Sequence, residues 1–290
     1  MVANILVNWL VQASVYAMLA VGFSLIFSIA RVTFLCYTAF YMLSCYLLYF
    51  FFFLQGWNLL LGIIFSIGIT AILGVLSYRF IVHRVREWET ATLVITVALG
   101  LAIQEVVSLG FGEDYLGVPS FIQGSVKIIN VGVTYQHILT FGVAVILLIA
   151  LWTFLTKHKM GIVVRAVADD REVANLMGIN EGKVIILITI ISTVMAAVAG
   201  VIMLPLVPLE PGMWISPFVV ICAIVIIGGL GSLKGSVIGA FVLSLAEMLV
   251  VFLVPGGSYL RSSMMLVVMV VVLIIKPEGL FGVVFEEERL

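Results

Sequence analysis

Two carboxylates inside apolar stretches of the sequence are the first candidates for chemistry. Glu105 follows Gln104 toward one end of the stretch 92–110, and Glu247 lies near the middle of 236–254. An ionised side chain at the centre of a bilayer costs about 2.5–3.5 kcal/mol on insertion scales, so each carboxylate needs a function or a partner. One interpretation is a proton or cation site facing a conduit. The other is a protonated group that bonds a serine or a backbone carbonyl.

Patterns typical of enzymes, metal sites and nucleic-acid binding are missing from the sequence. The three histidines are scattered, and there is no nucleophile elbow, zinc-protease pair or Gly-rich phosphate loop. The three cysteines are an odd number at unrelated spacings, which indicates neither a disulfide framework nor a metal site. Basic patches interleaved with aromatic residues are also missing. We therefore expect no catalytic residue, metal or cofactor on this chain, and no nucleic-acid partner.

The composition is typical of a membrane protein. Of the 290 residues, 64% are hydrophobic and 10% charged, which is too apolar for a soluble domain of this length to bury. About 20 apolar residues cross the bilayer core, so we predict an all-α polytopic bundle of about 8–9 transmembrane helices with broken or re-entrant segments, forming one domain over 1–290. The nine predicted segments are 5–29, 34–54, 58–79, 92–110, 136–156, 184–204, 217–233, 236–254 and 260–277.

The distribution of basic residues predicts the orientation. The stretch 157–183 is the longest polar interruption and carries five Lys and Arg residues. If it is cytoplasmic, alternation of the segments places twelve of the fourteen Lys and Arg residues on the same side, as the positive-inside rule requires. Only Lys127 and Arg261 then lie outside. We expect the N-terminus outside and the C-terminus, with Arg289, inside.

The polar loop 157–183 contains a predicted short helix. Asp169 or Asp170 at its start can accept hydrogen bonds from free backbone N–H groups, and Gly178 can end it in the left-handed conformation. Val173, Leu176 and Met177 then share one side of the helix. This apolar side either contacts a partner protein or lies on the membrane surface or its own domain, and the loop alone leaves these alternatives open.

Glycines interrupt one predicted segment and continue into the next. Gly228, Gly229 and Gly231 can break the helix, and Gly231, Gly235 and Gly239 recur every four residues. Small residues at this spacing permit close helix packing in lipid. A broken helix can also direct its terminus toward a substrate cavity. Packing and substrate contact are both compatible with the pattern.

Several motifs together resemble one protein family. R-A-V-A-D-D-R-E-V-A-N-L-M-G-I-N at 165–180, G-G-L-G-S-L-K-G-S-V-I-G-A at 228–240 and K-P-E-G-L-F-G at 276–282 are similar to membrane subunits of branched-chain amino acid ABC importers. Within that family, A-S-V-Y-A-M-L-A-V-G-F-S-L-I-F at 13–27 and T-V-A-L-G-L at 96–101 resemble the LivH-type subunit. The similarity spans nearly the whole chain in consistent order.

The resemblance implies a permease subunit that moves an amino acid, or a similar small polar solute, into the cytoplasm across the cytoplasmic membrane of a bacterium or archaeon. It implies four kinds of contact: two cytoplasmic subunits that bind ATP and Mg, a second permease subunit that is related or identical, an extracytoplasmic substrate-binding protein, and the lipid membrane. The substrate itself is left open, because in this family the binding protein sets much of the specificity.

The resemblance also assigns a role to the loop 157–183, as a cytoplasmic coupling loop. Glu172, Val173, Ala174 and Gly178 match the E-A-A-x-x-x-G spacing of ABC-importer permeases, whose short cytoplasmic helix sits in a cleft of the ATP-hydrolysing subunit. The small Ala174 would allow close approach. The predicted coupling residues are Asp170, Arg171, Glu172, Val173, Ala174, Leu176, Met177 and Gly178.

Candidates for the translocation path are drawn from the polar or family-specific positions of the apolar segments. The family usually has Asn-Phe-Ala-His-Gly after the first helix, whereas this chain has Thr-Phe-Leu-Cys-Tyr at 33–37, which is bulkier and leaves the substrate open. The candidates are Thr33, Cys36, Tyr37, Thr96, Glu105 and Glu247.

Two other functions are compatible with a polytopic membrane chain. An ion-coupled secondary transporter or channel would use Glu105 or Glu247 as its ion site. A non-transporting membrane scaffold would need neither carboxylate. A coupling loop that docks on an ATPase distinguishes an ABC subunit from both.

Overall fold

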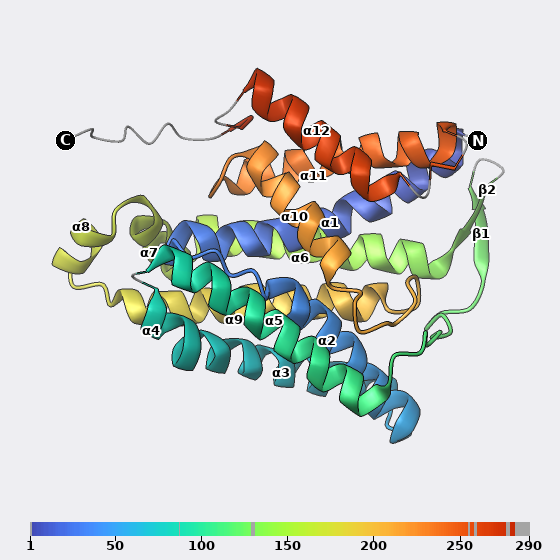
Figure 1. The fold of residues 1–290 in the computed structure, drawn as a ribbon, viewed down its shortest axis with the longest axis horizontal. Helices are drawn as coiled ribbons and strands as arrows, with labels where there is room; N and C mark the ends of the chain where they lie inside the picture. Colours follow the sequence, from blue (N-terminus) through green and yellow to red (C-terminus); the bar gives the residue numbers. More distant parts are fainter. Residues whose placement is uncertain are drawn as a thin grey trace.

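The chain forms a bundle of helices that lie roughly along one long axis, as the computed structural model in Figure 1 shows. The structure describes residues 2–86, 88–128, 131–254, 256–257, 260–276 and 279–281. Arg289, which we predict to lie on the cytoplasmic side, is outside the described residues, and so are three residues of the motif at 276–282.

The elements follow one another with few long connections. The first half of the chain contains α1 (Val2–Ala30), α2 (Tyr37–Tyr49), α3 (Leu59–Ser77), α4 (His83–Val85) and α5 (Glu89–Phe111). Single π-helical stretches, η1 (Phe50–Leu54) and η2 (Tyr78–Val82), continue α2 and α3. The second half contains α6 (Tyr135–Lys157), α7 (Lys159–Asp169), α8 (Arg171–Leu176), α9 (Glu181–Met203), α10 (Ile215–Gly228), α11 (Leu233–Leu253) and α12 (Arg261–Ile275).

An antiparallel hairpin of β1 (Ser125–Ile128) and β2 (Val131–Thr134) separates the two halves, with Ser125 opposite Thr134. The sequence analysis predicts no strand in this stretch. Figure 1 shows the hairpin and the start of α1 at one end of the bundle, and α4, α7 and α8 at the other. The long polar loop therefore lies at the end opposite the hairpin.

The prediction of an all-α polytopic membrane protein is confirmed. Among the described residues, seven helical stretches are long and apolar enough to cross a membrane, and Ile215–Gly228 and Ser263–Ile275 are shorter apolar helices. The seven are Asn4–Ala30, Tyr37–Leu54, Leu59–Val85, Glu89–Phe111, Tyr135–Lys157, Glu181–Met203 and Leu233–Leu253.

Helix α10 is the broken segment. With 14 residues it is about 21 Å long, which is less than the roughly 30 Å of hydrocarbon in a bilayer. Gly229 and Gly231 have φ angles of +94° and +82°, a conformation that only glycine adopts without strain. These glycines turn the chain from α10 into α11. The first helix therefore ends at Gly228, before the end of the predicted segment 217–233, and the next begins at Leu233, before the predicted segment 236–254.

A distant segment completes the end of α10. The Leu280 amide donates to the Ile227 carbonyl at 2.7 Å, and the Phe281 amide donates to the Gly228 carbonyl at 3.1 Å. Carbonyl groups in the last turn of a helix have no partner within it, and an unpaired one is costly in an apolar environment. Two residues of the 276–282 motif thus supply hydrogen-bond donors to the last carbonyl groups of the broken helix.

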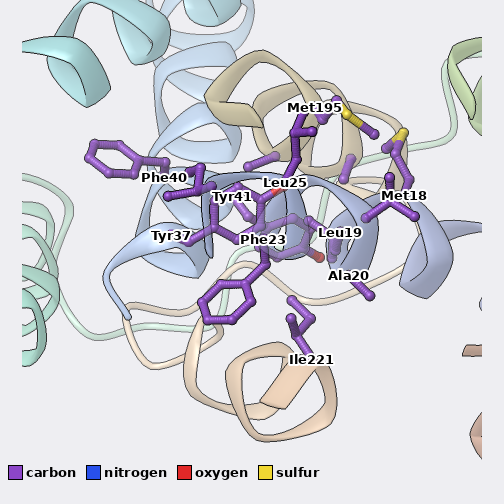
Figure 2. Close-up of a cluster of buried hydrophobic side chains, with 14 of the residues drawn as sticks. Met18, Leu19, Ala20, Phe23, Leu25, Tyr37, Phe40, Tyr41, Met195 and Ile221 are labelled. Carbon is purple, nitrogen blue, oxygen red and sulfur yellow. The ribbon is translucent and has the colours of Figure 1, made fainter. Parts of the chain in front are cut away.

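The interior lies between α1, α2 and α9 (Figure 2). Most of the apolar stretch of α1 is buried, 89% of it, compared with 17% for α5. Tyr37 and Phe40 of α2 are fully buried, and a Cβ added to Gly22 of α1 would meet the Tyr37 hydroxyl. Since lipid tails are as apolar as these helices, close van der Waals packing stabilises the bundle.

Candidate functional site

The helix predicted in the polar loop is α8, and local interactions define both of its ends. Asp170 has an extended backbone (φ −149°, ψ 114°), and its Oδ1 accepts a hydrogen bond from the Val173 amide at 3.0 Å. The sequence leaves Asp169 and Asp170 as alternatives for this cap, and the structure selects Asp170. Gly178 follows the helix in the left-handed region, with φ +82°.

Three large apolar side chains are exposed on α8 and on Met177, the residue that directly follows it. The exposed fractions are 53% for Val173, 86% for Leu176 and 79% for Met177. We call these three residues the α8 apolar surface. Glu172 is also exposed, whereas Ala174 is only 4% exposed and packs in the interior of its own chain. Ala174, the small residue of the motif, therefore packs α8 against the bundle.

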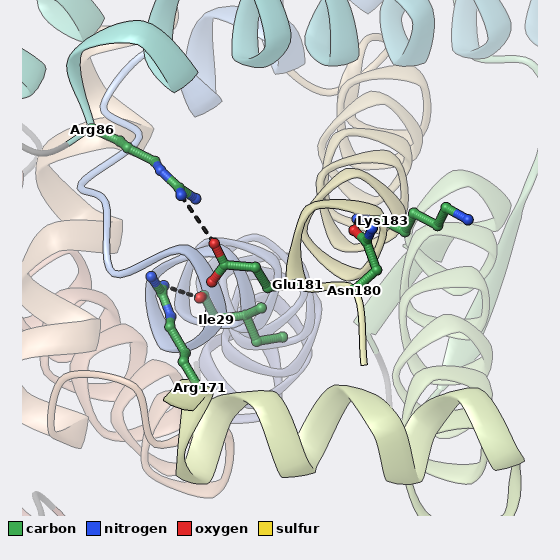
Figure 3. Close-up of polar contacts among 6 residues, drawn as sticks. All are labelled: Ile29, Arg86, Arg171, Asn180, Glu181 and Lys183. Atoms are coloured by element: carbon green, nitrogen blue, oxygen red, sulfur yellow. Dashed lines mark hydrogen bonds and ion pairs between the residues drawn. The ribbon is translucent and has the colours of Figure 1, made fainter. Parts of the chain in front are cut away.

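Arg171 turns inward from the start of α8. Its Nη2 donates a hydrogen bond to the backbone carbonyl of Ile29, close to the end of α1 (Figure 3). Helix α1 ends at Ala30, where Arg31 takes a left-handed φ of +47°, and the carbonyl groups of a last turn have no partner within the helix. Burial lowers the pKa of Arg171, and the Glu181 carboxylate offsets part of that decrease. The guanidinium stays charged and closes the end of α1.

A second arginine joins the neighbouring helices at this end. Arg86, which follows α4, lies 2.9 Å from Glu181 at the start of α9 (Figure 3). Burial lowers the pKa of Arg86, but the hydrogen bond and the charge of Glu181 raise it above its ordinary value. Asn180 caps α9 by accepting from the Lys183 amide at 3.1 Å. The ends of α1, α4, α8 and α9 are thus linked by polar contacts.

The six translocation-path candidates lie in four places: two pairs of residues and two separate carboxylates. Thr96 Oγ1 lies 3.2 Å from the Thr33 carbonyl oxygen, which joins α5 to the connection after α1. Cys36 and Tyr37 are fully buried in the bundle interior. The role of these four residues in a translocation path stays a prediction.

The two carboxylates have opposite environments. Glu247 is 1% exposed, and its Oε1 accepts a hydrogen bond from Tyr16 of α1 at 3.5 Å. Glu105 is exposed on the surface of α5. The glycines of the other predicted set lie at a helix crossing: a Cβ added to Gly235 would meet the Gly228 carbonyl oxygen, and one added to Gly239 would lie 2.9 Å from the Ile224 carbonyl oxygen.

The sequence analysis missed Arg86, Glu181 and the Ile29 carbonyl group. Glu181 does carry a local signal, because an acidic residue directly after a capping Asn is typical of a helix start. Nothing local pairs it with Arg86, which is 95 positions away, and a backbone carbonyl has no sequence signal at all.

Comparison with known proteins identifies the family. Residues 5–275 match the model of the permease component of branched-chain amino acid transport systems. The chain belongs to this family. It is the membrane permease component of an ABC importer, and the ATPase activity of such a transporter lies in partner subunits. The predicted LivH-type resemblance is confirmed.

Individual relatives of the permease agree over nearly full length. The BraD permease protein of Pseudomonas aeruginosa, from a high-affinity branched-chain amino acid transport system, is 25% identical over 96% of this chain and 94% of its own. LivH of Escherichia coli, from a system of the same description, is 26% identical over 95% and 94%. PsaBC from Streptococcus pneumoniae, solved with a Fab, has a TM-score of 0.53 at 16% identity, covers 96% and 97%, and supports the fold alone.

Proposed function

We propose that this permease moves a branched-chain amino acid, or a similar small polar solute, into the cytoplasm as half of a translocation path. A second permease subunit supplies the other half, a binding protein delivers the solute from outside, and two cytoplasmic subunits bind ATP and Mg. The family match over 5–275 supports the substrate class, and the relatives are named for the same transport.

The α8 apolar surface is the observation that carries the coupling proposal. Large apolar side chains held out on a polar loop favour a protein interface, because water contact with them is unfavourable. A short helix that presents Val173, Leu176 and Met177 fits into a groove of a partner. The ATP-binding subunit is the partner that an ABC importer requires on this side.

Arg171 provides the route from this contact to the membrane domain. It starts α8 and bonds the end of α1, and α1 is the most enclosed helix of the bundle. When ATP binding closes the paired ATP-binding subunits, α8 moves with them and displaces the end of α1. Nucleotide binding then favours one of the two conformations of the permease, open to the inside or open to the outside, over the other. Such a difference is what conformational coupling requires.

The proposed location is the cytoplasmic membrane of a bacterium or archaeon, with the N-terminus outside and the C-terminus inside. Support comes from the end of the bundle that holds Arg31, Arg86, Arg171 and Lys183, since Lys and Arg gather on the cytoplasmic side. The hairpin and the start of α1 lie at the opposite end, which faces the binding protein.

The direct test introduces a charge into the α8 apolar surface. Leu176→Asp is expected to weaken the binding of purified ATP-binding subunits by at least about tenfold, because a buried, unpaired carboxylate costs more than about 1.4 kcal/mol. Asn175→Asp adds the same charge at the exposed neighbouring position and is the control. Equal affinities for both variants would show that α8 is not the docking element. Solute uptake by the purified chain alone in vesicles would contradict the whole proposal.

A further inference from the structure

We propose that a groove between α6 and α11 binds one anionic phospholipid, whose phosphate contacts Lys234 while an acyl chain fills the groove. The groove has a volume of about 410 Å³. Nine of its ten lining residues are apolar, and the tenth is Lys234. We call it the α6–α11 groove. The inference concerns a ligand from the membrane and does not depend on which solute the permease moves.

The α6–α11 groove has α1 as its floor and two helices as its walls. Helix α1 packs against both α6 and α11, and these two have at most marginal contact with each other within the described part of the chain (Figure 1). Val21 of α1 is buried at the floor, whereas Ile149 and Trp152 of α6 and Ile238 of α11 are exposed along the edges. The groove therefore opens on the outer surface of the bundle.

The positions of Lys234 and Trp152 place the mouth of the groove at the membrane surface. Lys234 is the second residue of α11, which is about 32 Å long, so it lies at the edge of a roughly 30 Å hydrocarbon layer. Trp152 lies about 8 Å along the axis from the end of α6 at Lys157, a depth at which Trp is enriched. Leu148 and Val237 lie deeper. A charge above an apolar groove matches the two parts of a phospholipid.

The apolar lining excludes other occupants. An amino acid would leave a charged group without a partner below Lys234, and a buried water molecule needs at least two polar partners. A transmembrane helix is about 10–12 Å across, so two turns of it occupy roughly 800–1,200 Å³, about twice the volume of the groove or more. An extended hydrocarbon chain is thin enough and needs no polar partner.

The charge at the mouth favours an anionic headgroup. Lys234 Nζ lies 5.8 Å from the centre of the Trp152 ring, and the Arg86–Glu181 pair is the one salt bridge among the described residues, so no carboxylate there neutralises Lys234. The first turn of α11 contains no acidic residue, although the start of a helix carries a partial positive charge. Basic sites between transmembrane helices on the cytoplasmic side attract anionic lipid headgroups.

A lipid in the α6–α11 groove contacts both of its walls. Helix α6 leads into α7 and α8, and α11 follows the broken helix α10. Because α6 and α11 have little direct contact, the bound lipid stabilises their relative position. Anionic lipid should therefore raise the midpoint of thermal unfolding of the parent permease more than that of Lys234→Gln.

Quenching of Trp152 fluorescence by brominated lipids tests the groove. The full-length permease is reconstituted in phosphatidylcholine vesicles that contain a small fraction of either phosphatidylglycerol or phosphatidylcholine with brominated acyl chains. The difference between the parent and Trp152→Phe gives the Trp152 signal. Phosphatidylglycerol is expected to quench this signal at an about fivefold lower mole fraction than phosphatidylcholine, which corresponds to the attraction of one lysine for an anionic lipid surface.

Matched charge variants identify the phosphate site. Lys234→Gln should abolish the preference for phosphatidylglycerol. Lys183→Gln removes the same charge from an exposed position on α9 and should retain it. Equal quenching by the two lipids in the parent, or an unchanged preference in Lys234→Gln, would overturn the assignment of the headgroup to Lys234.

A matched pair of apolar variants tests where the acyl chain lies. Val237→Phe fills part of the groove and should remove most of the quenching of Trp152 by brominated phosphatidylglycerol. Val94→Phe makes the same change at an exposed position on α5 and should leave the quenching unchanged. Similar quenching in both variants would place the chain outside the α6–α11 groove.

The complete importer tests the rival occupant, a second permease subunit with side chains in the groove. That subunit would protect Trp152 from both brominated lipids, and this result would overturn the inference. Continued preference for phosphatidylglycerol in the complete importer is the expected result.

Discussion

The guanidinium of Arg86 lies 2.9 Å from the carboxylate of Glu181, although 95 positions separate them in the chain. This contact ties the end of α4 to the start of α9, next to the point where Arg171 holds the end of α1. The end of the bundle that carries α8 is therefore connected by two arginines from different parts of the chain. Each connection gives a separate prediction.

The Arg86–Glu181 pair is expected to stabilise the fold modestly. Both side chains are about a quarter exposed, so Glu181→Gln should lower the free energy of unfolding by about 1 kcal/mol or less. Exchanging the charges, with Arg86→Glu and Glu181→Arg together, should recover part of that loss. Thermal unfolding of the detergent-purified permease measures both effects, and Lys183→Gln is the exposed control. A double variant no more stable than either single charge reversal would show that the pair contributes nothing.

Arg171 is expected to affect transport more than docking. Arg171→Ala leaves the α8 apolar surface unchanged, so ATP-binding subunits should still bind. The link to the Ile29 carbonyl is lost, and transport per ATP hydrolysed should fall about 2–30-fold, which corresponds to a coupling energy of about 0.5–2 kcal/mol. Arg165→Ala, at an exposed position on α7, is the control. Loss of subunit binding in the Arg171 variant would show instead that Arg171 contacts the ATPase.

Gly235 should tolerate no side chain. A Cβ there meets the Gly228 carbonyl oxygen, so Gly235→Val forces α10 and α11 apart and should destabilise the permease by about 1–3 kcal/mol or more. At Gly68 of α3, a Cβ would meet no described atom within 4 Å beyond the neighbouring residues and backbone of its own helix, and Gly68→Val is the matched control. The yield of monodisperse protein and the midpoint of thermal unfolding distinguish the two. Equal stability would place the helices farther apart than the structure has them.

The backbone conformation of Gly178, at the end of α8, should affect the binding of ATP-binding subunits. Gly178 has φ +82°, where a residue with a Cβ is strained by roughly 1–2 kcal/mol. Gly178→Val should displace Leu176 and Met177 and weaken the affinity for ATP-binding subunits. Gly178→Asn should retain most of it, since Asn tolerates this conformation. Titration of labelled ATP-binding subunits gives the affinities, and similar losses in both variants would argue against a conformational cause.

The features predicted correctly from sequence depend on interactions between near neighbours or on composition. Apolar stretches of about 20 residues insert into a bilayer wherever they occur, so the polytopic class follows without knowledge of the packing. The ends of α8 also depend on residues within the helix and next to it: Asp170 binds the Val173 amide, and Gly178 takes its own left-handed φ. The β1–β2 hairpin was not predicted, because strands of four residues give too short a run of alternation to distinguish them from a loop.

Glu105 and Glu247 mark what tertiary structure had to decide. Each is a single carboxylate in an apolar helix, and the sequence predicts the helix and the cost of the charge equally for both. Only the packing of α1 against α11 brings Tyr16 to Glu247, and only the contact of Trp214 with Gln104 leaves Glu105 facing outward. By itself the sequence determined the membrane class, the family motifs and the short helix of the polar loop, because those depend on composition and local spacing. Which side chains face inward depends on contacts between residues far apart in the chain, so only the folded bundle decides it.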